Sequence, residues 1–200
     1  MKHFYLMAVL LLTTLSHGQS AKEALLAENS ATVAAQLKLM NYLDYCTMKY
    51  VRLNAQQRAQ ADVGFASYYR DVIALSPYPD MDIPAYLGYA KDYTPTTWLE
   101  FVVPVYKKNL ENLIALIEKY GYLTTERITK YDKQAGIFAP YYISRNKDYD
   151  DVLKKLIKRE YKEGNIPEKE YKDVMLVLKR GTIINLSDFK QSTDFGIIRN

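Results

Sequence analysis

The stretch VPVYKKNLENLIALIEKYG, residues 103–121, decides the fold class of this chain. Its apolar side chains recur at gaps of three and four residues, at Val103, Tyr106, Leu110, Leu113, Ile117 and Tyr120. That spacing places one apolar face on an α-helix, and Gly121 follows where a C-cap glycine is common. Pro104 indicates that the helix either begins there or is kinked there.

Similar apolar stripes lie on both sides of this segment. The preceding ones are Leu39, Leu43, Cys46, Tyr50 and Leu53, then Phe65, Tyr69, Val72 and Ile73; the following ones are Val152, Leu153, Leu156, Ile157 and Tyr161, then Tyr171, Val174, Met175 and Leu178. Short helices gain little stability alone and need one another's apolar faces. We therefore expect an all-α protein, a single-domain irregular helix bundle over residues 19–200. A short non-helical C-terminal tail should end it, in which residues 182–186 could form one strand.

Residues 1–18 have the three parts of a secretory signal peptide. Lys2 supplies a positive charge, residues 4–15 form an apolar run, and Ser16-His17-Gly18 has small residues where a signal peptidase reads them. The run is shorter than the roughly 20 residues that span a bilayer, and no second long apolar run follows. We expect cleavage after Gly18, a mature chain without a transmembrane segment, and a periplasmic or secreted location.

The residue types that remain after cleavage exclude several classes of activity. Both histidines, His3 and His17, lie in the signal, so Ser-His-Asp and Cys-His nucleophiles and His-based zinc sites are excluded. No Gly-rich phosphate loop is present. Lys and Arg total 27 and Asp and Glu total 23, a net charge of +4, and the two signs are interleaved. We therefore expect no metal, no cofactor and no nucleic-acid partner, and we assign no catalytic residue.

Cys46 is the single cysteine, so no disulfide can form within one chain. A free thiol could pair two chains. Because Cys46 lies inside an apolar stripe, and because free cysteine is often buried, we expect it in the core instead.

Carboxylate chemistry needs no histidine, because two Asp or Glu side chains can cleave a glycosidic bond. The candidate clusters are Asp80 with Asp82, and residues 148–151 with three aspartates. Both clusters stand beside expected helix starts, where acids cap free N–H groups and favour the helix dipole. That structural role is the preferred interpretation.

Tyrosine is unusually abundant, with 19 residues in the chain. Tyr86, Tyr89 and Tyr93 follow gaps of three and four residues, close to the only tryptophan, Trp98, in a segment with four prolines. If Pro84 starts a helix, the three rings share one face and could stack on a sugar or a peptide. We take these four residues as candidate binding residues, which requires Trp98 and at least two of the tyrosines to be accessible. The alternative is that the rings close the core.

Residues 109–181 carry motifs of a widespread bacterial family of unknown function. The matching pieces are Asn109 to Gly121 with Tyr122, the stretch Ala139 to Asp148, Gly164-Asn165-Ile166 and Lys179-Arg180-Gly181. The chain resembles that family but departs from it twice. The family's His is absent from Ser144-Arg145-Asn146-Lys147-Asp148, and its final Tyr-Gly-Thr-Gln motif is missing. The resemblance implies a helical fold and adds nothing about activity.

These observations favour an exported, non-enzymatic helical protein that binds a protein or an envelope glycan. The alternative is a carboxylate-dependent glycan hydrolase of the cell envelope. The two differ in one visible feature, because a hydrolase needs two facing carboxyls in a cleft.

Overall fold

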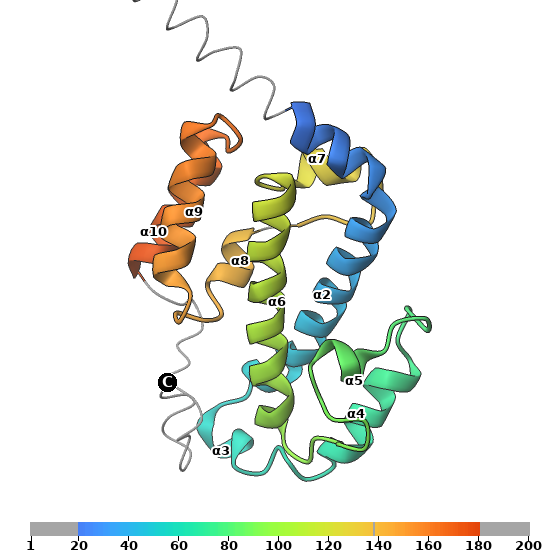
Figure 1. Cartoon of the computed structure of the whole chain (residues 1–200). Helices are drawn as coiled ribbons and strands as arrows, with labels where there is room; N and C mark the ends of the chain where they lie inside the picture. The colour runs from blue at the N-terminus through green and yellow to red at the C-terminus, as the bar shows by residue number, and fades with distance from the viewer. Residues whose placement is uncertain (1–19, 138, 181–200) are drawn as a thin grey trace, which may run out of the picture.

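The computed structural model describes residues 20–137 and 139–180, which form helices joined by loops and contain no strand (Figure 1). The helices are residues 20–28, α2 (Ser30–Val51), α3 (Ala55–Arg58), α4 (Phe65–Ala74), α5 (Ile83–Tyr86), α6 (Trp98–Tyr120), α7 (Thr125–Thr129), α8 (Ala139–Ile143), α9 (Asp150–Lys162) and α10 (Glu168–Arg180). The all-α prediction is confirmed. The expected signal peptide and the expected tail with its strand lie outside the described residues.

Helix α6 is central, with α2 on one side of it and α9 and α10 on the other (Figure 1). Its first turn is closed by a capping box, in which the Thr97 side chain accepts from the Glu100 N–H and the Glu100 side chain accepts from the Thr97 N–H. Its last turn ends at Gly121, whose φ of 76° lies in the left-handed region. The helix therefore begins at Trp98, before Pro104, and Pro104 lies inside it.

A tyrosine from outside the helix compensates for Pro104. Proline has no N–H, so the Glu100 carbonyl four residues earlier loses its intrahelical donor. The Tyr89 hydroxyl donates to that carbonyl at 2.5 Å. The loop that carries Tyr89 is thereby tied to the helix turn that the proline weakens.

Two hydrophobic clusters run along α2 and α6. The upper core joins α2, α6, α8, α9 and α10, with members that include Leu37, Met40, Leu113, Ile117, Tyr142, Leu153, Ile157 and Val174. The lower core joins α2 and α6 to α4, with members that include Leu43, Cys46, Tyr50, Phe65, Tyr69, Trp98 and Phe101. Cys46 is 6% exposed, so its predicted burial is confirmed.

The proline-free run from residue 20 to residue 70 is not one helix. It is interrupted after residue 28, again at residues 52–54, and before α4. Asn54 forms a capping box with Gln57 that starts α3, and Gly64 has a φ of 82° immediately before α4. Local capping and a left-handed glycine therefore set these boundaries.

Candidate functional site

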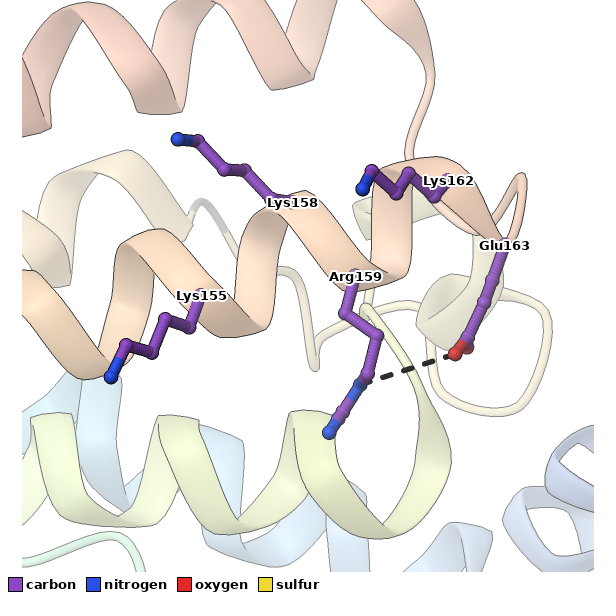
Figure 2. A pocket seen from close by; sticks show the side chains of 5 residues that line it. All are labelled: Lys155, Lys158, Arg159, Lys162 and Glu163. Atoms are coloured by element: carbon purple, nitrogen blue, oxygen red, sulfur yellow. Dashed lines mark ion pairs between the residues drawn. The ribbon is translucent and has the colours of Figure 1, made fainter.

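Helix α9 carries a basic face on its solvent side. Leu153, Leu156, Ile157 and Glu160 are buried on the inner side of the helix. The opposite side presents a stripe spaced at i, i+3, i+4, i+7 and i+8, which we call the basic face: Lys155, Lys158, Arg159, Lys162 and Glu163. These side chains line a shallow groove of about 500 Å³ (Figure 2).

The charges of the basic face are largely uncompensated. Arg159 pairs with Glu163 at 4.0 Å, the dashed line in Figure 2, and with Glu160 at 3.3 Å. Within the described residues, no carboxylate lies within ion-pair distance of Lys155, Lys158 or Lys162. Three ammonium groups spaced over about two helical turns therefore project a positive potential into solvent.

Glu160, on the buried side of α9, fixes the helix in place. Its carboxylate accepts from Lys22 Nζ at 3.1 Å, from the Tyr122 N–H at 3.1 Å and from Asn165 Nδ2 at 2.8 Å. Burial raises the pKa of Glu160, but the bonds from Lys22 and Asn165 outweigh it and hold the pKa below the usual value. A side chain at Gly121 would meet Glu160 Oε2 at 3.2 Å, so the glycine lets the carboxylate approach the end of α6.

The structure contradicts the expectation for Trp98. Its side chain is 3% exposed and stacks on Tyr50, with ring centroids 5.4 Å apart and an interplanar angle of 13°. Its indole N–H donates to the Ala61 carbonyl at 3.0 Å. Trp98 fills the lower core, because it stands at the first turn of α6 where that helix faces α2 and α4, and it is not accessible to a ligand.

The three tyrosines do not share one helix face, because α5 ends at Tyr86 and Gly88 has a φ of 77°. The Tyr86 hydroxyl donates to Asn109 Oδ1 at 2.9 Å, and burial raises the pKa of Tyr86. The Tyr89 hydroxyl donates to the Glu100 carbonyl. Tyr93 is 42% exposed and packs against Tyr89. Two of the three rings thus have clear structural contacts, and only Tyr93 presents a large exposed surface.

A buried ion pair lies where α2, α6 and α8 meet. Arg145 Nη2 donates to Asp44 Oδ2 at 3.2 Å, and both side chains are almost fully enclosed. The guanidinium lies over the rings of Tyr141 and Tyr106, at 4.0 Å and 5.3 Å from their centroids. Burial raises the pKa of Asp44 against the opposing charge of Arg145. The pair is enclosed by aromatic rings, which makes it an internal crosslink of the bundle.

Part of each acidic cluster has the structural role that its position indicated. Asp82 caps α5 by accepting from the Ala85 N–H at 2.9 Å, and Asp150 and Asp151 lie in the first turn of α9. Among residues 20–137 and 139–180, no three His, Cys, Asp or Glu side chains come together in a group that could hold a metal ion. No helix in the same ranges combines the length and apolar character needed to cross a membrane.

The charge balance along the chain does not reveal the basic face, because residues 150–163 hold four acidic residues beside five basic ones. The signal that finds it is the helical projection: the buried Glu160 and the first-turn aspartates leave the outer stripe to the cations. The net charge of the segment does not show that acids and cations lie on different sides of the helix, whereas the net charge of each helix face does.

Comparison of the chain with protein-family models, with curated proteins and with solved structures gives no match. The resemblance of residues 109–181 to a bacterial family therefore remains a prediction.

Proposed function

We propose that this chain is an exported, non-enzymatic helical protein that binds an anionic glycan of the cell envelope through the basic face of α9. The observation that carries the proposal is the set of three lysines, Lys155, Lys158 and Lys162, around one shallow groove. Their ammonium groups have no ion-pair partner in the described part of the chain. Anionic substituents of a ligand would supply the missing counter-charges. Export rests on the pattern of residues 1–18.

A glycan fits this face better than a folded protein does. Protein interfaces gather aromatic residues, Met and Arg at their centre and are depleted in Lys. The basic face has the reverse composition, with three lysines and one arginine. Lysine is a strongly hydrated point charge on a flexible stem, so it can follow phosphate or carboxylate groups on a flexible polymer. An acidic protein is the competing partner, and the experiment below includes it.

The arrangement of carboxyls supports binding over hydrolysis. Glu163 is the one carboxyl among the residues that line the groove, and it pairs with Lys22 at 3.2 Å as well as with Arg159. A glycosidase needs two carboxyls on either side of the scissile bond. Glu160 lies beneath the groove with its oxygens already occupied by donors.

The test is binding of the chain from Gln19 onward to immobilised polygalacturonate, an anionic glycan, at increasing salt. We expect binding at low salt that weakens steeply as screening increases. The variant Lys155→Ala/Lys158→Ala/Lys162→Ala should bind about tenfold more weakly or worse, taking each exposed charge contact at about 0.5–1 kcal/mol.

The matched control is Arg70→Ala/Lys91→Ala/Lys133→Ala, which removes the same charge from exposed positions outside α9. Equal loss in both triple variants would reduce the effect to net charge and overturn the proposal. Absence of glycan binding, with capture of an acidic protein such as a polyglutamate-rich carrier instead, would also overturn it. Export is checked separately by N-terminal sequencing of the envelope fraction, which should begin at Gln19.

A further inference from the structure

Two stacked tyrosines join α9 to α10 beside the basic face. The rings of Tyr161 and Tyr171 lie 4.0 Å apart between centroids, with an interplanar angle of 11°. Tyr171 is half-buried and packs against the upper core, whereas Tyr161 is 37% exposed. Because Tyr171 covers one face of the Tyr161 ring, the exposed area of Tyr161 belongs to its other face and its edge.

Two lysines of the basic face lie close to Tyr161 in the sequence of α9. Lys158 is three residues before Tyr161 and Lys162 is next to it, and both extend to the α10 side of α9 (Figure 2). On α10, Lys172 forms an ion pair with Glu168 at 2.6 Å. The hydrogen bond and charge of Glu168 raise the pKa of Lys172, so this ammonium already has its counter-charge. The exposed Tyr161 ring therefore shares the α10 side of α9 with two lysines that have no ion-pair partner in the described residues.

The stack also makes the ring rigid. Tyr171 is held by the core, and the two helices that carry the rings are in contact along their length. A pre-ordered aromatic ring loses little conformational entropy when a ligand covers it. That distinguishes Tyr161 from Tyr45, which is 76% exposed on α2 and stacks on no ring in the described part of the chain.

We infer that Tyr161 is a sugar-stacking subsite: the apolar C–H face of a pyranose ring lies on its exposed face, while Lys158 and Lys162 bind carboxylate or phosphate groups of the same chain. This inference rests on the proposed function and narrows it, because it requires the ligand to carry rings as well as charges. Single-stranded nucleic acid also combines rings with charge, but its binding sites offer several aromatic rings to successive bases. The described residues of α9 and α10 expose one aromatic ring, and the chain's pI of about 8.9 is not that of a strongly basic domain.

The experiment compares three probes against the chain from Gln19 onward: polygalacturonate, which has rings and charges, inorganic polyphosphate, which has charges alone, and a single-stranded oligonucleotide. Tyr161→Leu keeps an apolar cover over Tyr171 but removes the flat ring. We expect it to weaken polygalacturonate binding about tenfold and to leave polyphosphate binding within about twofold. Tyr161→Phe should bind polygalacturonate like the parent chain, and Tyr45→Leu is the control for loss of an exposed tyrosine.

The possible results separate the two proposals. If the parent chain binds neither polygalacturonate nor polyphosphate, the proposed function fails. If it binds both and Tyr161→Leu weakens both equally or neither, the stacking subsite is refuted while the basic face stands. Tighter binding of the oligonucleotide that depends on Tyr161 would refute the glycan assignment. Thermal unfolding establishes that each variant folds, and Tyr161→Met replaces Tyr161→Leu if that variant does not.

Discussion

Replacing Tyr89 with Phe removes one hydroxyl and tests whether a loop tyrosine completes the central helix. The hydroxyl donates at 2.5 Å to the Glu100 carbonyl, which Pro104 leaves without an intrahelical donor. The contact is partly buried, so water can replace the hydroxyl only in part. We expect Tyr89→Phe to lower the free energy of unfolding by about 1–2 kcal/mol, the cost of leaving such a carbonyl unpaired.

Pro104→Ala supplies the second edge of a double-mutant cycle. It restores an N–H that can donate to Glu100 and removes a proline from a helix interior, so it should stabilise the chain by about 1–3 kcal/mol. In the Pro104→Ala background the carbonyl keeps a donor when Tyr89 is changed. The cost of Tyr89→Phe should then fall to about 0.5 kcal/mol, which gives a coupling energy near 1 kcal/mol.

Urea unfolding followed by far-UV circular dichroism measures all four free energies, with equal m-values as the sign that the unfolded state is unchanged. Tyr45→Phe is the control, because its ring is 76% exposed and loss of its hydroxyl should change stability by less than about 0.5 kcal/mol. A Tyr89→Phe cost that is the same in both backgrounds to within about 0.3 kcal/mol would refute the reasoning.

Three further perturbations test other parts of the structure. Arg145→Met leaves the buried Asp44 carboxylate unpaired and should lower the free energy of unfolding by about 3–5 kcal/mol. Adding Asp44→Asn should recover a large part of that loss. Equal stability of the single and double variants in urea unfolding would contradict this. The pKa of Glu160 is lowered, so its carboxylate stabilises the fold above pH 4.5 and this stabilisation is lost as the pH falls below that value. Glu160→Gln should therefore lower the melting temperature at neutral pH and reduce the fall of the melting temperature in acid. An unchanged fall of the melting temperature in acid would count against this role. Burial raises the pKa of the Cys46 thiol, so alkylation should be slow in the native state and fast in denaturant, and rapid native labelling would be inconsistent with the lower core.

Helix α6 shows what local pattern could predict. The apolar stripe from Val103 to Tyr120 and the C-cap Gly121 depend on helix periodicity and on one backbone conformation, both of which act over a few residues. Cys46 was predicted in the same way, from its place in a stripe, and it is buried. The apolar stripe alone leaves open whether the helix begins at Pro104 or is kinked there, and the capping-box spacing of Thr97 and Glu100 is the signal that places its start at Trp98.

The absence of histidine from residues 18–200 also belongs to what the sequence alone determines, because residue type limits chemistry whatever the fold. The sequence alone does not determine which aromatic rings are buried and which are exposed. Tyr86, Tyr89 and Trp98 are amphipathic side chains that suit a core contact and a binding surface equally well. Trp98 is a core residue because α2 and α4 bring Tyr50 and Phe65 against it. Tyr89 stabilises α6 because its loop returns to the Glu100 carbonyl.

The tertiary structure alone decided which charges meet. Asp44 and Arg145 are 101 residues apart and form one enclosed pair, and Glu160 is held by Lys22 from a helix 138 residues away. Whether a lysine on α9 is neutralised or free depends on such partners, and no pattern along the chain records them. Secondary structure follows from short-range periodicity, but the electrostatic character of a surface follows from long-range contacts, since Coulomb interactions depend on distance and burial.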